Sequence, residues 1–270
     1  MLRKYMMCTV MAVGICFASA CMAQFADDFE NGVGNWEVSW WTGATFISDS
    51  NGNPGKAGYY SMGTNTGWIQ VLPQPWTDAQ LSGDYRFSAD LKFKQNDMEC
   101  VVLARGNSLW TMDFYGVSFT KTHQADWKIN IYGPYAGVGP VFTASNVPAG
   151  FVFHNSPDEW NHVEVLVHGT RLEVTVNGTL LYKGKGHSSR KLTGRAAVRT
   201  GWFGKFEIDN AFVESTPLSG NCEDSILSGY GLKADINEDC YVDFTDFAYL
   251  VDRWALCIDP NVSECERVWE

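Results

Sequence analysis

Leu172-Glu-Val-Thr-Val-Asn-Gly-Thr-Leu-Leu-Tyr182 is the stretch of this 270-residue chain that decides its fold. Apolar and polar residues alternate on both sides of Asn177-Gly178, as in two strands that each bury one face. Asn-Gly favours a two-residue hairpin turn, because both central residues of that turn need positive φ. The stretch therefore predicts an antiparallel β-hairpin. Asn177-Gly-Thr179 also matches a glycosylation sequon, but hairpin chemistry explains it without a glycan.

The same alternation recurs through residues 24–215, where helical periodicity is nearly absent. Further strands are predicted at 85–93, 110–119, 127–132 and 162–168. A long series of short strands is typical of a two-sheet sandwich. The sequence therefore predicts an all-β domain over residues 24–215, a short linker at 216–221 and a small module at 222–270.

Three stretches of the β-rich region resemble concanavalin A-like lectin/glucanase domains. They are the run from Trp160 to Gly178, the opening Asp27-Asp-Phe-Glu-Asn-Gly-Val-Gly-Asn-Trp36 and the ending Phe206-Glu-Ile-Asp-Asn-Ala-Phe-Val213. The resemblance implies a jelly-roll sandwich that often binds sugar and is sometimes a glycoside hydrolase. It also implies that Trp36 and Trp160 are core residues. Related jelly rolls hold a calcium ion between the first and last strands, which points to Asp27 or Asp28 with Asp209. Asp209 bonding only backbone at a strand end is the alternative.

Glycoside hydrolysis usually requires two carboxylates that flank one bond. Laminarinase-type members of the fold carry them as Glu-x-Asp-x-x-Glu, and this sequence lacks that string. We expect the acidic and imidazole side chains of the strands to face solvent: Glu99, Asp113, Glu164, His154, His162 and His168. This favours a non-catalytic protein. A sibling family with the same sandwich hydrolyses keto-sugar glycosides without the string, so a glycosidase-like enzyme is the alternative, and a structural or adhesive surface protein is a third.

A carbohydrate-binding role requires less, because aromatic faces stack on sugar rings while polar groups bond the hydroxyls. The β-rich region is rich in tryptophan and tyrosine. The aromatic side chains expected in loops or on exposed strand faces are the candidates for a glycan or polysaccharide site: Trp41, Trp76, Tyr132, Tyr135 and Trp202.

Asp235-Ile-Asn-Glu-Asp-Cys-Tyr-Val-Asp-Phe-Thr-Asp246 has the spacing of a twelve-residue calcium loop. Its oxygen donors occupy positions 1, 3, 5, 7, 9 and 12: Asp235, Asn237, Asp239, the Tyr241 carbonyl, Asp243 and Asp246. Two departures stand out, since Cys240 takes the place of the usual turn glycine and Asp246 that of the longer glutamate. Val242 is expected to anchor the loop to a core. The loop predicts a Ca²⁺ site.

An exiting helix is predicted from Phe247, Leu250, Val251 and Trp254, at i, i+3, i+4 and i+7. With the loop, this pattern resembles a dockerin repeat over residues 221–265, present in one convincing copy. The resemblance implies an EF-hand-like module that docks through the helix of residues 244–256 onto a cohesin-like or cell-surface protein.

Four cysteines follow residue 220, and a small exported module is where disulfides are expected. Three pairings are open, of which Cys222–Cys240 with Cys257–Cys265 is our choice. A zinc site is the alternative, disfavoured by the absence of a Cys-x-x-Cys spacing and of nearby histidine. Cys100 is expected to be a buried free thiol.

Residues 1–23 have the pattern of a signal peptide, with Arg3 and Lys4, an apolar run and small residues before Gln24. The sequence therefore predicts a secreted or cell-surface protein with no transmembrane segment; cleavage before Cys21, leaving a lipid anchor, is the alternative. The chain carries a net charge of −11, and residues 220–270 hold twelve acidic against three basic residues. That balance excludes nucleic acid as an expected partner.

Overall fold

The computed structural model describes residues 24–38, 44–62, 67–71, 84–94, 98–106, 115–121, 128–132, 142–143, 148–185, 194–201, 204–216, 221–229 and 231–256. The predicted signal peptide of residues 1–23 lies outside these ranges. None of the helices in the described part of the chain is long and apolar enough to span a membrane.

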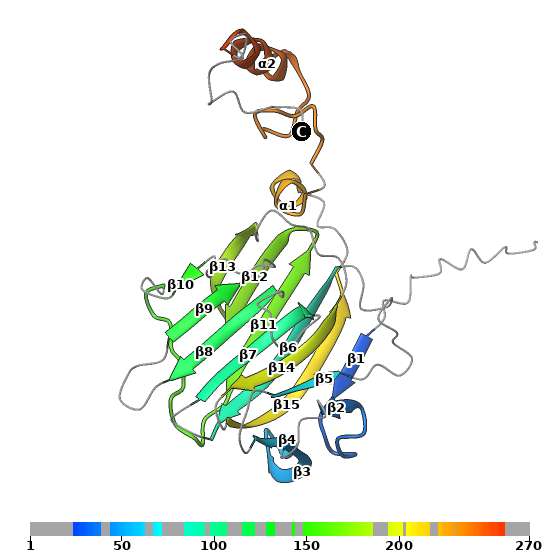
Figure 1. The fold of residues 1–270 in the computed structure, drawn as a ribbon, viewed down its shortest axis with the longest axis vertical. Coiled ribbons are helices and arrows are strands. Elements are labelled where there is room, and N and C mark those ends of the chain that lie inside the picture. Colours follow the sequence, from blue (N-terminus) through cyan, green and yellow to red (C-terminus); the bar gives the residue numbers. More distant parts are fainter. Residues whose placement is uncertain are drawn as a thin grey trace, which may run out of the picture.

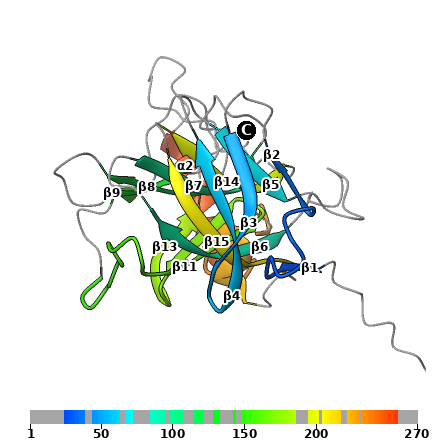
Figure 2. The same ribbon diagram turned by 90° about the horizontal axis from the view of Figure 1, so that it is seen from below.

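Two antiparallel sheets form the β-rich region and pack face to face (Figure 1). The eight-stranded sheet runs in the order β13 (Thr179–Lys185), β12 (Arg171–Val176), β11 (Asn161–His168), β6 (Tyr85–Phe93), β15 (Lys205–Ser215), β4 (Gly55–Met62) and β3 (Ala44–Gly52), and β1 (Gln24–Asp27) pairs with β15. The seven-stranded sheet runs in the order β10 (Phe142–Thr143), β9 (Lys128–Tyr132), β8 (Tyr115–Lys121), β7 (Met98–Gly106), β14 (Arg195–Gly201), β5 (Gly67–Val71) and β2 (Trp36–Val38). The view from below shows both layers (Figure 2). The predicted all-β sandwich is confirmed.

The core fills the space between the sheets because alternate residues of each strand point inward. In β11, Val163, Val165 and Val167 are fully buried while the residues between them are half-buried. Phe87 of β6 and Phe119 of β8 are also fully buried, one from each sheet. Burying each such side chain contributes roughly 1.5–3 kcal/mol, so the alternation read in the sequence supplies the main stabilisation of the sandwich.

The hairpin that opened the sequence analysis is confirmed. Strands β12 and β13 pair across Asn177 and Gly178, whose φ angles are 49° and 74°. Trp36 is in the core, as the family resemblance implied. Trp160 is not: it is half-buried just before β11, and the Lys92 ammonium lies 4.4 Å from its ring centroid. The reason is that its ring covers a charged side chain on the outer face of the eight-stranded sheet.

The C-terminal region contains α1 (Cys222–Leu227) and α2 (Phe244–Leu256), separated by the predicted calcium loop. Asn221 caps α1 by accepting a hydrogen bond from the Asp224 backbone N–H. The short helix α1 lies against the end of the sandwich beside the β11–β12 turn, and α2 lies farther out (Figure 1).

Candidate functional site

The twelve-residue loop between the two helices is closed by its last acidic residue. Asp246 is 3% exposed at the start of α2. One of its oxygens accepts the backbone N–H groups of Ile236 and Asn237 at 2.6 and 3.2 Å, and the other accepts that of Asp243 at 2.8 Å. These N–H donors, that of Asp243 foremost, lower the pKa of the Asp246 carboxyl, so it stays charged near neutral pH. Loop positions 2, 3, 9 and 12 are thereby held together.

Acidic and amide side chains organise the first half of the loop in the same way. Asp235 accepts the backbone N–H groups of Asp239 at 3.0 Å and Cys240 at 2.8 Å. The Asn237 amide donates to Asp239 at 2.8 Å, and Asp239 in turn accepts the N–H of Tyr241 at 2.9 Å. The side chains at positions 1, 3 and 5 therefore lie next to one another, and each has an oxygen atom, the ligand type that Ca²⁺ prefers. The residues present fit a calcium ion, and calcium binding stays a prediction.

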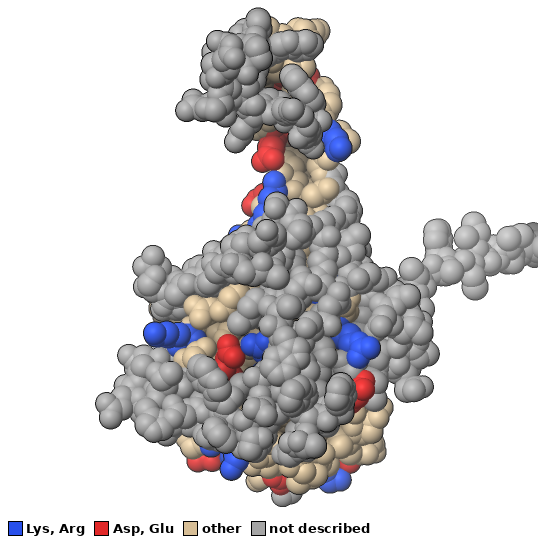
Figure 3. Space-filling view, viewed as in Figure 1, with Lys and Arg blue, Asp and Glu red and all other residues tan. Residues whose placement is uncertain are grey.

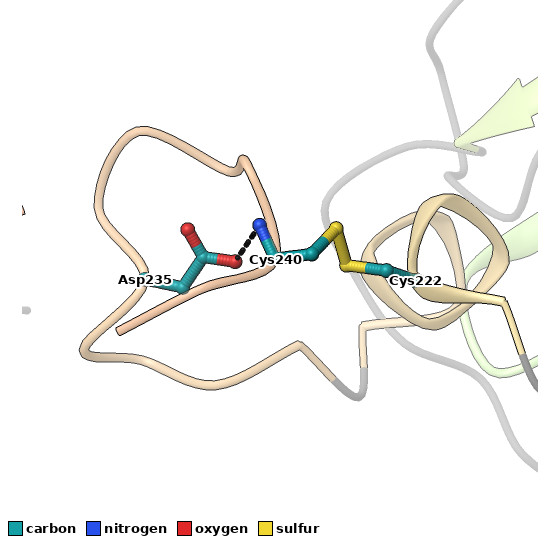
Figure 4. A group of neighbouring side chains, drawn as sticks. All are labelled: Cys222, Asp235 and Cys240. Atoms are coloured by element: carbon teal, nitrogen blue, oxygen red, sulfur yellow. Dashed lines mark hydrogen bonds between the residues drawn. A yellow bond between two sulfur atoms is a disulfide. The ribbon is translucent and has the colours of Figure 1, made fainter. Parts of the chain in front are cut away.

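Cys240 adopts the backbone conformation expected of the glycine it replaces. Its φ is 81°, in the left-handed region that costs a residue with a side chain about 1–2 kcal/mol. A disulfide joins Cys240 to Cys222 at the start of α1, and this is the first of the two predicted pairs. Figure 4 shows this bond beside the hydrogen bond from Cys240 to Asp235. The bond holds the sharp turn of the loop against α1.

The side chains of Cys222, Asp235 and Cys240 lie close enough together to hold a metal ion. However, the two sulfur atoms are joined to each other, so neither supplies the thiolate that a zinc site needs. The cluster is therefore a structural staple. Cys257 and Cys265 lie outside the described residues.

The apolar residues around the loop do not face a core. Val242, expected to anchor the loop to a core, is 53% exposed, because the loop lies between α1 and α2, away from the core of the sandwich (Figure 1). On α2, Phe244, Phe247 and Val251 are also exposed, at 90%, 60% and 48%. Their spacing places them on one side of the helix. The described part of α2 thus presents an apolar surface.

A second candidate site lies on the outer face of the seven-stranded sheet. Strand register places Glu99 of β7, Ser118 of β8 and Arg199 of β14 on this face, opposite the core. The Ser118 hydroxyl donates to Glu99 at 3.1 Å, and the Arg199 guanidinium lies 3.3 Å from the same carboxylate. Figure 3 looks onto this face and shows acidic and basic side chains at its surface. Glu99 was expected to face solvent; it is half-buried, and Ser118 and Arg199 are its partners.

Tyr132 of β9 is on the same face and packs against Val101, Leu103 and Ala197. Burial raises the pKa of its hydroxyl, with Glu99 adding to the shift, so the phenol is neutral at physiological pH. It was one of five aromatic candidates. The other four fall outside the described residues: Trp41, Trp76, Tyr135 and Trp202.

The predicted second metal site is at the start of the sandwich. Asp28 is exposed and lines an open pocket of about 360 Å³ between β1 and β15. Asp209 is buried, and its two oxygens accept the backbone N–H groups of Asn53 at 2.6 Å and Asn210 at 2.8 Å. Burial raises the pKa of the Asp209 carboxyl. Asp209 therefore fills the backbone-bonding role, and the metal stays a prediction. Asp27 accepts hydrogen bonds from Phe29 and Trp36.

Two histidines on β11 have different surroundings. His162 faces outward, as expected, and its Nδ1 lies 2.6 Å from Asp90. His168 lies on the same face of β11 and was also expected to face solvent, and this is wrong. It is 4% exposed and lies between Ser228, at 2.9 Å, and Asp84, at 3.1 Å.

The grouping of Ser228, His168 and Asp84 has the residue types of a catalytic triad. Sequence analysis missed it because these residues come from three distant parts of the chain. Burial lowers the pKa of His168, which favours the neutral imidazole. Ser228 is fully buried, so its hydroxyl is closed to any substrate. This grouping is therefore part of the packed contact between the end of α1 and the sandwich.

In comparison with protein families, residues 26–206 match the 3-keto-alpha-glucoside-1,2-lyase-like domain. The chain belongs to this family. The match covers most of the sandwich and excludes the predicted calcium loop. Comparison with curated protein sequences gives no match.

Solved structures share the family domain's sandwich fold. A Bacillus subtilis protein of unknown function with a galectin-like fold superposes with a TM-score of 0.50 at 10% identity, covering 71% of this chain and 94% of its own. The protein Cip1, described as cellulose-induced, gives 0.45 at 14% identity, with 73% and 100% covered. A sialidase gives 0.46 at 14% identity; 88% of this chain corresponds to only 21% of the sialidase. At these identities the likeness concerns the fold alone.

Proposed function

We propose that this is a secreted carbohydrate-binding protein. Its sandwich takes a glycan or polysaccharide on the outer face of the seven-stranded sheet. Its calcium-stabilised, dockerin-like C-terminal module attaches it to a cohesin-like or other exported or cell-surface protein. The observation that carries the carbohydrate proposal is the half-buried Glu99 carboxylate, held by the buried Ser118 and Arg199, on the same face as the half-buried Tyr132 ring.

This network suits a sugar ligand because its polar groups are already oriented. Ser118 is fully buried and Arg199 is 6% exposed, so these two side chains hold the half-buried Glu99 carboxylate in one orientation and do not reach a ligand themselves. Sugar recognition uses such fixed polar groups together with an aromatic surface. Membership in a family named for keto-glucosides makes 3-keto-α-glucosides and the parent glucosides the first ligands to examine.

Binding is tested with a glycan array on the whole secreted chain, followed by calorimetry on the best ligand. We expect Glu99→Gln and Tyr132→Ala each to weaken binding at least fivefold. Glu164→Gln is the matched control, because Glu164 is a partly exposed strand residue on the opposite sheet. Equal losses in all three variants, or no loss in the first two, contradict this site.

The family match also favours a second function, that of a glycosidase-like or lyase-like enzyme. Incubating the protein with 3-keto-α-glucosides and following products by chromatography separates the two. Turnover that disappears in Glu99→Gln but persists in Glu164→Gln supports an enzyme. Binding without turnover supports a lectin-like protein.

The tail proposal is supported by the oxygen-donor loop and by the exposed apolar side of α2. Calcium fixes such a loop by joining its carboxylates, and a helix with an exposed apolar surface is suited to docking. Calorimetric titration of the full chain with Ca²⁺ tests the first step. The docking step is tested by adding a purified cohesin domain with and without Ca²⁺, with Phe247→Ser as the variant expected to lose binding.

Secretion is proposed from residues 1–23 alone. Mass spectrometry of protein recovered from the medium is expected to show a chain that begins at Gln24. A lipid-modified Cys21 at the amino terminus supports the anchored alternative, and an intact Met1 contradicts both.

A further inference from the structure

The contact between the C-terminal region and the sandwich is buried and charged. Asp224 of α1 is 4% exposed, and its two oxygens lie 2.9 Å from Arg171 of β12 and 2.9 Å from Lys183 of β13. These two basic residues stand on neighbouring strands of the eight-stranded sheet. A buried carboxylate is tolerated only with close partners. The two ion pairs of Asp224 therefore fix the position of α1 on the sheet.

The end of α1 is seated by the turn between β11 and β12. The Thr170 backbone N–H donates to the carbonyl of Ser228 at 3.0 Å, and its hydroxyl donates to that of Leu227 at 2.7 Å. The turn thus satisfies carbonyl groups that the end of a helix leaves without partners. At Gly169, with φ of 55°, an added Cβ would lie 1.7 Å from the Ser228 oxygen, so this close approach requires glycine.

The opposite end of α1 is bonded to the calcium loop. Cys222, the first residue of the helix, forms the disulfide with Cys240, and Cys240 donates its N–H to the first loop ligand, Asp235. A further link crosses directly, since the Lys185 ammonium lies 3.5 Å from Glu238 in the loop. A continuous series of contacts therefore runs from β12 and β13 through α1 to a predicted ligand.

We propose that the sandwich positions the calcium loop through this series of contacts, so that calcium binding and sandwich stability are energetically linked. Asp224 is a positioning residue: it touches no predicted ligand but fixes α1, which fixes Cys240 and Asp235. The inference rests on the proposed calcium site. Within the described residues, the contacts of α1 with β12 and β13 and the Cys222–Cys240 disulfide restrict the position of the loop. Linkage is reciprocal. A change at the contact of Asp224 with Arg171 and Lys183 therefore alters the affinity for calcium, and bound calcium stabilises the sandwich.

The test compares Asp224→Asn with Glu223→Gln in the full-length secreted chain. Both changes remove one negative charge from α1, but Glu223 is 75% exposed and Asp224 is buried. We expect Asp224→Asn to bind Ca²⁺ at least fivefold more weakly by calorimetry, and Glu223→Gln to match the wild type. At 100-fold excess over the dissociation constant, Ca²⁺ is expected to raise the wild-type melting temperature by about 5–10 °C. The shift is expected to shrink in Asp224→Asn.

Three results overturn the proposal. If the wild type releases no heat with Ca²⁺, the calcium site itself fails and the linkage fails with it. If Asp224→Asn binds Ca²⁺ as tightly as the wild type, or if Ca²⁺ leaves the sandwich transition unchanged, the site stands and only the linkage fails. Should Asp224→Asn not fold, Lys183→Gln supplies the same comparison, because it keeps the Arg171 pair and lies at a partly exposed position.

Discussion

Asp235 accepts a 2.8 Å hydrogen bond from the backbone N–H of Cys240, the residue that a disulfide joins to Cys222. The first predicted calcium ligand and the covalent staple thus meet at one residue. Because the staple fixes Cys240, it also restricts where the Asp235 carboxylate points. The conformation of the loop can therefore be tested by measuring calcium binding and the free energy of unfolding, without an activity assay.

Removing one charge from the loop should weaken calcium binding. Asp239→Asn keeps an oxygen acceptor for the Tyr241 N–H but loses one of four carboxylates. We expect at least a tenfold higher dissociation constant by calorimetry, because carboxylates offset the charge of the ion. Asp252→Asn, exposed on α2 outside the loop, is the control and should bind as the wild type does. Equal affinities in all three proteins would remove Asp239 from the ligand set.

The left-handed conformation of Cys240 predicts a preference for glycine once the disulfide is absent. In a Cys222→Ser background, Cys240→Gly should be more stable than Cys240→Ala by about 1 kcal/mol, since only glycine adopts positive φ without cost. Urea denaturation followed by circular dichroism measures the difference. A more stable alanine variant would show that residue 240 does not hold positive φ in solution.

The pair of His162 and Asp90 predicts a pH-dependent contribution to stability. The hydrogen bond with Asp90 raises the pKa of His162 above 6.5, although burial opposes this. Burial raises the pKa of Asp90, but hydrogen bonds from His162 and Asn210 outweigh this effect, and the pKa of Asp90 lies below its ordinary value of 3.8. The stabilisation that the pair contributes is therefore fully present between pH 3.8 and 6.5, the ordinary pKa values of the two groups. It is lost as the pH rises through the folded pKa of His162 or falls through that of Asp90.

The measurement is the free energy of unfolding of wild type and His162→Gln across pH. The excess stability of the wild type should be largest near about pH 5 and should decline as the pH rises above about 6.5 and the imidazole loses its proton. A constant difference across this range would mean that the pair is not ionised in the folded protein.

Cys100 should resist alkylation until the sandwich unfolds. Its thiol is free and fully buried in the core, and burial raises its pKa, so little reactive thiolate forms. Iodoacetamide treatment with mass spectrometry should show no modification of Cys100 in the native protein and complete modification in denaturant. Rapid native labelling would contradict the burial of this strand. The expectation of a buried free thiol at Cys100 is confirmed by the structure.

Local pattern was enough to predict several elements of this protein. Alternation and the Asn177-Gly178 pair predicted strands and a hairpin, because side-chain period and turn conformation depend on neighbouring residues. The loop of residues 235–246 was recognisable for the same reason: its donors are spaced along one short segment. Expectations that depended on burial were less uniform: those for Cys100 and Trp36 are confirmed, and those for Trp160, Val242 and His168 were wrong. Burial depends on neighbours that the sequence does not place.

The sequence by itself determined the β-sandwich, the position of the loop and the acidic charge of the tail. Only the tertiary structure decided that Asp224 forms ion pairs with Arg171 and Lys183, and that the Ser228 hydroxyl contacts the buried His168. These residues are distant in the chain, and no periodicity relates them. Long-range ion pairs form where folding brings two surfaces together, so their partners become visible only once both surfaces are built.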